Sequence, residues 1–365
     1  MRILILTNND GGLYHFRKEL LEKLIELGHK VDICLPNGTY IEQMKEMGCS
    51  FIACDLLDRH GTNPFKELAL IRFYHKIIKV THPDIVFTYT IKPNVYGGIV
   101  CGMKHIPYIE NITGLGSAVE NSGIMQKITL CLYRFGVKKA KKVFFQNQYN
   151  QDYMLSHHIV AGDYDLLPGS GVDLQKFTYM DYEMAENTKF LIIGRMMKDK
   201  GTDEVLEAAK IIRKKYPDTM FTFIGDADES GYREKIVQAQ REGNICYEGI
   251  QSDVRPYIKE CSAVIHASYH EGMSNVLLEA AASGRPVIAT DVPGCIDTYI
   301  PEVSGIAFRA KNANSLVEAL ERFLALTVEQ RQKMGQEGRK YVEEHFDRNI
   351  VIQKYVDELK DIKES

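Results

Sequence analysis

The sequence lacks any long apolar run. No stretch of its 365 residues approaches the ~20 consecutive apolar residues that a transmembrane helix needs. The apolar run that begins at Met1 ends at Thr7, and the polar residues Asn8 to Asp10 follow at once, so it is too short for a signal peptide. We therefore expect a cytoplasmic protein, peripheral at most at the cytoplasmic face of a membrane.

Paired cysteines and a surplus of positive charge are also missing. The eight cysteines stand singly, without a CxxC pair or a Cys/His cluster at zinc-finger spacing, which favours reduced and mostly buried thiols. The formal net charge is −4, whereas proteins that bind nucleic acid usually carry a basic surplus. An apolar fraction of 45% and a charged fraction of 26% are typical of soluble globular proteins.

Short β-branched apolar runs alternate with helical patterns in two successive arrays. This alternation predicts βαβ units and parallel sheets, and the chain is too long for one ordinary core. Between the arrays, Thr178–Thr188 is polar and has no apolar periodicity, so we expect the domain linker there. The predicted strands are Arg2–Thr7, Val31–Leu35, Ser50–Ala53, Ile85–Thr88, Pro107–Glu110, Val143–Gln146, Lys189–Ile193, Thr219–Ile224, Ile245–Tyr247, Ala263–His266, Pro286–Ala289 and Gly305–Phe308.

The predicted fold class is therefore α/β, with two Rossmann-like domains that face each other across a cleft. The expected domains are residues 1–175 and 176–345, followed by a C-terminal helix, 346–365, that packs back towards the first domain. Ligands of open parallel sheets bind outside the carboxyl ends of the strands, so we expect a small-molecule site in the cleft.

Gly11 and Gly12 stand between the first predicted strand and a helical pattern over Leu13–Leu27, which Gly28 would end. A glycine turn before a helix leaves backbone N–H groups where an anion can bind, although a tight turn explains the pair equally well. The spacing is neither GxGxxG nor a P-loop, so the nicotinamide and NTPase fingerprints are absent.

Two basic residues, Arg195 and Lys200, follow the first predicted strand of the second array. A guanidinium and an ammonium at the carboxyl end of a strand suit a diphosphate. From the spacing alone, two solvated loop residues are an equally good interpretation.

The segment from His270 to Ala281 carries the strongest pattern. Ser274 or Asn275 is a good N-cap for a helix that runs to about Ser283, and its free N–H groups could hold a phosphate. Glu271 precedes the cap and can reach a sugar hydroxyl, while Glu279 lies inside the helix and could accept from both ribose hydroxyls. Taken singly, each glutamate could instead be a solvated charge.

These glutamates resemble a known motif. The segment Glu271–Glu279 is similar to the E-x7-E motif of the GT4 family of retaining glycosyltransferases, which have the GT-B fold. The resemblance covers nearly the whole chain, and it extends to a bacterial subgroup that builds lipid-linked oligosaccharides and capsular polysaccharide. The further segments that carry it are Thr88–Gly97, Thr113–Gly116, Gly169–Asp173, Gly194-Arg195, Lys200-Gly201 and Leu278–Thr290.

The resemblance implies a retaining, metal-independent hexosyltransferase. It would move a hexose or an N-acetylhexosamine from a UDP-sugar bound by the C-terminal domain to a glycan acceptor, linked to polyprenyl pyrophosphate, on the N-terminal domain. The expected catalytic set is Arg195, Lys200 and Glu271, with the two basic residues on the diphosphate, Glu271 on the donor sugar and Glu279 on the ribose. The other expected donor contacts are Gly12, Ile250 (in the loop Gly249–Asp253, against the uracil), Gly272, Met273, Ser274 and Asn275.

No protein nucleophile emerges from the sequence, and the resemblance implies a same-face attack in which the leaving phosphate helps to deprotonate the acceptor. On the acceptor side we expect Lys92, Glu110, Asn111 and Thr113, whereas His15 and His270 are weaker candidates.

A D-x-D triplet occurs at Asp226-Ala227-Asp228, where carboxylates could bridge a divalent ion to a diphosphate. Arg195, Lys200 and a helix N-terminus already supply positive charge there. We therefore interpret the triplet as a polar loop and expect no metal and no other cofactor.

A basic stretch covers Asn121–Gln151, which contains no Asp or Glu. Within residues 124–142, a stripe of basic side chains runs beside one apolar helical face, a pattern typical of contact with the inner leaflet of a membrane or with an acceptor pyrophosphate. A helix packed on the first sheet with a solvated basic edge is the alternative. The apolar face comprises Ile124, Ile128, Leu132 and Phe135, and the stripe comprises Lys127, Arg134, Lys138 and Lys141. The stretch also contains Lys139 and Lys142.

Two other classes of function share this architecture. A UDP-sugar 2-epimerase would need its own acid–base carboxylates and would not need the E-x7-E set. A non-catalytic nucleotide-sugar-binding protein would not need so complete a set of motifs.

Overall fold

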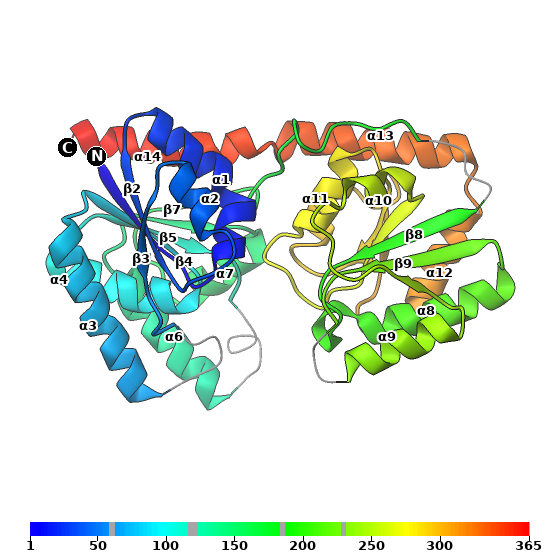
Figure 1. Ribbon diagram of the computed structural model, residues 1–365, viewed down its shortest axis with the longest axis horizontal. Coiled ribbons are helices and arrows are strands. Elements are labelled where there is room, and N and C mark those ends of the chain that lie inside the picture. Colours follow the sequence, from blue (N-terminus) through cyan, green and yellow to red (C-terminus); the bar gives the residue numbers. More distant parts are fainter. Residues whose placement is uncertain (58–62, 116–122, 183–186, 228–230, 365) are drawn as a thin grey trace. The chain divides into compact units, whose positions relative to one another are not determined.

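A computed structural model describes residues 1–57, 63–115, 123–182, 187–227 and 231–364. The chain divides into two compact units (Figure 1). The first unit contains residues 1–170 and 349–365, and the second contains residues 171–348.

The first unit is built on a seven-stranded, wholly parallel sheet with the strand order β3-β2-β1-β4-β5-β6-β7. The order reverses between β1 and β4, which is the kind of switch point where open α/β sheets bind ligands. The strands are β1 Arg2–Leu6, β2 Lys30–Leu35, β3 Ser50–Ala53, β4 Ile85–Tyr89, β5 Tyr108–Ile112, β6 Lys142–Phe145 and β7 Tyr164–Leu166.

Helices cover this sheet on both faces (Figure 1). They are α1 Asp10–Glu26, α2 Ile41–Glu46, α3 Pro64–Thr81, the π-helical turn η1 Pro93–Gly97, α4 Gly98–Lys104, α6 Ile124–Val137 and α7 Gln148–Ser156. The first helix begins earlier than its apolar pattern suggests, because the Asn9 side chain caps it by accepting from the Gly12 N–H at 2.5 Å. Gly11 and Gly12 therefore lie in the first turn of α1 and not in a loop before it.

The C-terminal helix α14, Arg348–Glu364, completes the core of the first unit. Its Tyr355 is fully buried, with its ring against those of Phe87 and Phe144 at centroid distances of 5.3 and 5.1 Å. The Tyr355 hydroxyl donates to the Asn111 side-chain oxygen and accepts from the Tyr89 hydroxyl at 3.1 Å. This helix thus brings a polar anchor into the interior of the unit, where Arg17 and Asn111 are also buried.

The second unit has a six-stranded parallel sheet in the order β10-β9-β8-β11-β12-β13. Its strands are β8 Thr188–Ile193, β9 Thr219–Ile224, β10 Cys246–Tyr247, β11 Ala263–His266, β12 Val287–Thr290 and β13 Gly305–Phe308. Its helices are η2 Lys198–Lys200, α8 Thr202–Lys215, α9 Tyr232–Arg241, α10 Arg255–Glu260, α11 Asn275–Ala282, η3 Ile296–Thr298, α12 Ala313–Leu324 and α13 Val328–His345.

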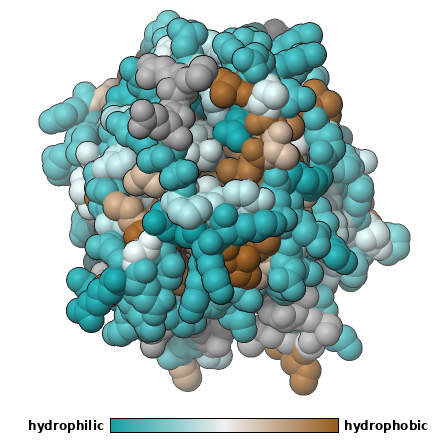
Figure 2. Space-filling view, turned by 90° about the vertical axis from the view of Figure 1, so that its right-hand side faces the viewer, coloured by the Kyte–Doolittle hydropathy of each residue, from teal (hydrophilic) through white to brown (hydrophobic). Residues whose placement is uncertain are grey.

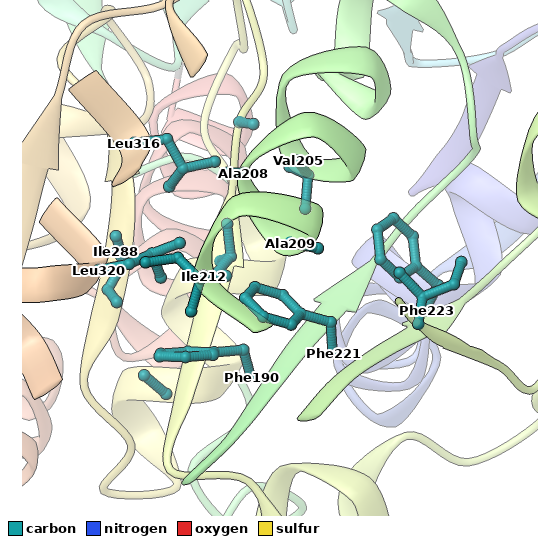
Figure 3. Packing of buried hydrophobic residues seen from close by; sticks show 14 of the residues in the cluster. Phe190, Val205, Ala208, Ala209, Ile212, Phe221, Phe223, Ile288, Leu316 and Leu320 are labelled. Carbon is teal, nitrogen blue, oxygen red and sulfur yellow. The ribbon is translucent and has the colours of Figure 1, made fainter. Parts of the chain in front are cut away.

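Both faces of the second sheet are buried. Phe190, Phe221 and Ile288 pack on one side with α8 and α12 (Figure 3), whereas Leu191 and its neighbours pack on the other side with α11 and α13. Strands buried on both faces read as continuous apolar runs, which is why they could be located in the sequence. On the molecular face in Figure 2, the hydrophobic residues gather in small groups among hydrophilic ones.

The predicted α/β fold class and all twelve predicted strands are confirmed, apart from shifts of one or two residues at strand ends. The three-residue strand β7 was missed because it is short. The chain changes units at 170/171, ahead of the expected linker, and residues 180–182 pack within the second unit. There the Met180 and Asp181 carbonyls accept from the buried Arg285 guanidinium, at 2.8 and 3.0 Å.

We predict that Tyr355→Phe destabilises the first unit by about 1–3 kcal/mol, because the Asn111 oxygen loses its donor inside the core. Calorimetry should show one lowered unfolding transition, and amide exchange should rise in α14. Tyr149→Phe, at a ring that is 54% exposed, is the matched control. Identical unfolding of the two variants would contradict the role of this anchor.

Candidate functional site

Three loops meet at the carboxyl ends of the central strands of the second unit. They follow β8, β11 and β12, which are neighbours in the sheet. The Tyr269 N–H donates to the Asp199 carbonyl at 2.9 Å, the Thr290 hydroxyl to the Ser268 carbonyl at 2.7 Å, and the Ser274 N–H to the Gly294 carbonyl at 2.8 Å. The loops therefore hold one another, and the residues on them occupy defined positions.

Lys200 ends the short helix η2 in the loop after β8. The next residue, Gly201, has a left-handed backbone with φ of 67°, and a Cβ atom there would overlap the Ala267 carbonyl. Only glycine fits both constraints, and it turns the chain into α8 directly behind Lys200. Arg195 stands on the same loop with an exposed side chain.

Lys200 and Glu271 form an ion pair between the β8 and β11 loops. The lysine ammonium donates to Oε1 of Glu271, and the two side chains are only 27% and 18% exposed. The same oxygen lies 3.0 Å from Nε2 of His266, the last residue of β11. The structure thus brings together two residues that the sequence placed 71 positions apart, and adds a histidine that the sequence analysis did not single out.

The surroundings of Glu271 keep its carboxylate ionised. Burial alone would raise the pKa of Glu271, but the hydrogen bond with His266 and the positive charge of Lys200 outweigh it and lower the pKa to about 2. Glu271 is therefore an anion and a strong hydrogen-bond acceptor across the physiological range.

The loop that carries Glu271 rests on Gly294, in the loop after β12. Gly294 has φ of 78°, and a Cβ atom there would press into the carbonyl groups of Glu271 and Gly272. The backbone that bears the acidic group therefore packs against position 294, which only a glycine can occupy without strain.

The helix α11 begins as predicted. Ser274 is its N-cap, and its side chain accepts from the Leu277 N–H at 3.4 Å. The Met273 side chain is buried in the core. Four backbone N–H groups were expected to bind the UDP-sugar, those of Gly272, Met273, Ser274 and Asn275. The Ser274 N–H already donates to the Gly294 carbonyl. Because the helix N-terminus carries a partial positive charge, it still favours an anion next to this loop.

Glu279 lies one turn inside α11 and is half-buried. Burial raises its pKa to about 7, although the nearby charges of Lys176 and Arg348 act in the opposite direction. These two basic residues are missing from the sequence prediction. Pairing of distant segments places them there. The Val172 N–H donates to the Phe346 carbonyl at 2.8 Å and the Arg348 N–H donates to the Val172 carbonyl at 3.1 Å, so the segment around Val172 pairs with the start of α14.

Ile250 and the D-x-D triplet, which the sequence analysis singled out, lie on loops next to this edge of the sheet. Ile250 follows β10 and its side chain is 74% exposed, in a loop that is tied back by a bond from the Gly225 N–H to the Gly249 carbonyl at 2.8 Å. Asp226 follows β9, and its carbonyl accepts from the Met196 N–H at 2.7 Å. Asp228, the second acid of the D-x-D triplet, lies outside the described residues.

The expected acceptor residues of the first unit are largely internal. Glu110 is fully buried in β5, and burial raises the pKa of its carboxyl group well above the ordinary value. Asn111 is 1% exposed, donates to the Thr88 carbonyl at 3.0 Å and accepts from Tyr355. Neither side chain presents itself to an acceptor in this conformation, because both belong to the interior that holds α14.

The remaining predicted residues of the first unit lie nearer its surface. Lys92 forms a half-buried ion pair with Glu67 at 2.8 Å, and Thr113 follows β5 in a half-buried position. His15 packs edge-on against the Tyr40 ring with a centroid distance of 4.6 Å. The Gly12 N–H is occupied by Asn9, so an anion at this helix would have to use its neighbours.

Two family models match the chain. Residues 2–147 match the family described as "Glycosyl transferase 4-like", and residues 183–341 match "Glycosyl transferases group 1". The chain is 25% identical, over 98% of its length and 97% of the relative's, to N,N'-diacetylbacillosaminyl-diphospho-undecaprenol alpha-1,3-N-acetylgalactosaminyltransferase of Campylobacter jejuni. It is 23% identical, over 80% of its length and 78% of the relative's, to UDP-Gal:alpha-D-GlcNAc-diphosphoundecaprenol alpha-1,3-galactosyltransferase of Escherichia coli.

Solved structures share the fold over the whole chain. A glycosyltransferase from Rickettsia africae is 19% identical with a TM-score of 0.79, covering 99% of this chain and 98% of its own. HepE of Anabaena in complex with UDP-glucose is 16% identical with a TM-score of 0.79, covering 99% of this chain and 100% of its own. The chain is therefore a glycosyltransferase with a glycosyl transferase 4-like domain in its N-terminal half and a group 1 glycosyltransferase domain in its C-terminal half, in two α/β units of the GT-B type.

Proposed function

We propose that the protein is a retaining glycosyltransferase that takes a hexose or an N-acetylhexosamine from a UDP-sugar. The acceptor is a hydroxyl group of a saccharide carried on a polyprenyl diphosphate, and the product enters surface polysaccharide or oligosaccharide synthesis. The observation that carries this proposal is the placement of Lys200 and Glu271 together at the carboxyl edge of the second sheet, next to the N-terminus of α11. The E. coli relative is named for a UDP-sugar donor and a diphosphoundecaprenol-linked acceptor, which supports both substrate classes.

The second unit supplies contacts for each part of the donor. Lys200 and Arg195 take the diphosphate, the carboxylate of Glu279 accepts from the ribose hydroxyls, Ile250 and its loop lie against the uracil, and Glu271 accepts from the sugar. Negative charge grows on the UDP as the glycosidic bond breaks, and the two basic residues with the positive end of α11 stabilise it. These groups already supply the positive charge that the reaction needs, so we propose that it runs without a metal.

Retention follows in this proposal from attack on the face that UDP leaves. Glu271 is held by Lys200 and His266, and it serves as a fixed acceptor rather than as a nucleophile. The departing phosphate takes the proton of the acceptor hydroxyl, and the acceptor is bound by the first unit. Lys92 and Thr113 remain the accessible candidates there, because Glu110 and Asn111 are internal.

The outer side of α6 supports a contact with an anionic membrane, which would give access to a polyprenyl-linked acceptor. Its inner side packs Thr129, Tyr133 and Val137 into the unit, while Ile124, Ile128 and Phe135 are 79%, 47% and 59% exposed. Three of the four residues of the predicted apolar face are therefore exposed, whereas Leu132 packs against the core of the unit. Among the helices that the structure describes, none is both long and apolar enough to span a bilayer.

Only part of the basic stripe is available for this contact. Lys141 and Lys142 pair with Glu358 of α14 at 3.7 and 3.1 Å, whereas Lys127, Arg134 and Lys138 are exposed beside the apolar residues. We therefore define the membrane surface by Ile124, Lys127, Ile128, Arg134, Phe135 and Lys138. Exposed apolar residues flanked by cations are the pattern of an interfacial helix.

The direct test of the activity is a screen for UDP release from UDP-glucose, UDP-galactose, UDP-N-acetylglucosamine and UDP-N-acetylgalactosamine, with and without a polyprenyl-diphosphate saccharide. We expect acceptor-dependent release from one donor and an α-configured product by NMR. Lys200→Ala and Glu279→Ala should each weaken UDP binding at least tenfold, about 1.4 kcal/mol, in calorimetry. Lys210→Ala and Glu318→Ala, at exposed positions of α8 and α12, are the matched controls. Unchanged UDP affinity in folded site variants, or epimerised donor without acceptor, would contradict the proposal.

The raised pKa of Glu279 predicts that UDP binding is pH-dependent. Because burial raises this pKa to about 7, the carboxylate that the ribose needs is present above that value and is lost as the pH falls through it. Affinity for UDP should therefore fall about tenfold between about pH 8 and about pH 6, as the ionised fraction falls. The phosphate of UDP titrates as well, so Glu279→Gln is measured in parallel. The same pH dependence in both proteins would refute the assignment of Glu279.

The membrane surface predicts flotation with vesicles that contain phosphatidylglycerol. Each basic residue near such a surface contributes about 1 kcal/mol, so replacing Lys127, Arg134 and Lys138 by glutamine should reduce the bound fraction at least tenfold at low salt. Ile124→Ser with Phe135→Ser should do the same at any salt concentration. Val80→Ser, at a site that is 67% exposed at the end of α3, is the control. Wild-type protein that stays in the soluble fraction at low salt would disprove the contact.

A further inference from the structure

We propose that His266 is a positioning residue. It holds the Glu271 carboxylate in the orientation in which it accepts a hydrogen bond from the sugar of the UDP-sugar, while Lys200 binds the diphosphate. The proposal rests on the proposed function, because it assigns Glu271 to the donor sugar. It adds a residue that neither the motif nor the charge pattern of the sequence indicates.

Lys200 and His266, which both contact Glu271, differ in how firmly they are held. His266 is the last residue of β11, a strand between β8 and β12, and its backbone pairs with Ala289 of β12. Its side chain is 9% exposed and has only two rotatable bonds, so the position of Nε2 is set by the sheet. Lys200 lies on a loop, is 27% exposed and has four rotatable bonds. A group on a strand positions its partner more accurately than a group on a loop.

Both partners contact the same oxygen, Oε1 of Glu271. A bound diphosphate attracts the Lys200 ammonium, so the Glu271 carboxylate has to share this cation with the phosphate. The hydrogen bond from Lys200 to Glu271 is weakened as a result. His266 cannot follow the phosphate, since it is buried in the sheet. Its hydrogen bond of 3.0 Å to Glu271 is thus a contact that remains when the UDP-sugar binds.

The chemistry of the imidazole suits this task. Nε2 carries a proton in one neutral tautomer and in the cation, so it can donate to a carboxylate in either state. With Oε1 fixed by His266, the plane of the Glu271 carboxylate is also fixed, and with it the direction in which the group accepts from a sugar hydroxyl. The hydrogen bond with His266 also favours the ionised form of Glu271 as Lys200 shifts towards the phosphate.

The strand around His266 gives a reason to read this residue as functional. The other residues of β11 are Ala263, Val264 and Ile265, and all three are fully buried in the apolar core. His266 stands at the last position of the strand, where it meets the loops of the site, and its Nε2 faces Glu271, the acid that also pairs with Lys200. A residue that only filled space would not need a donor at Nε2.

The test compares His266→Leu, which keeps bulk but removes the donor, with His266→Gln, whose amide N–H can take the place of Nε2. For the UDP-sugar that the screen identifies, we expect His266→Leu to lower kcat/KM at least tenfold while the Kd for UDP alone changes less than about threefold. His266→Gln should restore most of the loss. His29→Leu, a histidine of similar burial in the first unit, is the control for loss of a buried imidazole and should keep the wild-type kcat/KM.

A double-mutant cycle decides whether the histidine acts through Glu271. In a Glu271→Gln background, His266→Leu should cause no further loss, because the group that it positions has been altered already. Additive losses, equal losses in the leucine and glutamine variants, or a parallel loss of UDP affinity would each overturn the positioning role.

A measurement without turnover separates this proposal from the proposed function. In protein labelled with ¹⁵N-histidine, the Nε2 signal that disappears in His266→Gln identifies His266, and it should shift in Glu271→Gln. An unmoved signal would overturn the contact even in an active enzyme. If the signal shifts but no UDP-sugar is turned over with any acceptor, the proposed function has failed and the positioning role fails with it.

Discussion

The ion pair between Lys200 and Glu271 is the contact on which the account of the site depends. It joins the loops after β8 and β11, whose backbones pack closely at Gly201, next to the Ala267 carbonyl, and at Gly294, next to the carbonyl of Glu271. The pair puts a cation for a diphosphate beside an anion for a sugar. Because His266 contacts the same carboxylate oxygen from the rigid strand, the acid can keep its position when the lysine turns to a phosphate.

The first unit contains polar side chains that are buried in its core. Asn111 and Tyr355 form a buried connection between the sheet and the returning helix α14, and the neighbouring Glu110 is buried without charge compensation. Asn111, at the carboxyl end of β5, therefore makes its hydrogen bonds inside the unit. What this unit offers to the outside is the surface of α6, where Ile124 and Phe135 lie among cations.

The sequence allowed the strands to be predicted because runs buried on both faces are continuous, and it allowed the start of α11 to be predicted because Ser274 has the chemistry of an N-cap. It could not reveal Lys176 and Arg348 beside Glu279, since they are brought there by pairing of segments far apart in the chain. It could not show that the Asn111 side chain is buried, because a position at a strand end does not say whether the side chain turns inward. His266, the partner of Glu271 on β11, was missed because a single histidine forms no motif with a recognisable spacing.

The most direct measurement of the central claim is a crystal structure of the protein with UDP. We expect diphosphate oxygens within about 3 Å of the Lys200 ammonium, with the ribose hydroxyls on the Glu279 carboxylate and with His266 still bonded to Glu271. A nucleotide whose diphosphate lies away from Lys200 and whose ribose lies away from Glu279 would contradict the account.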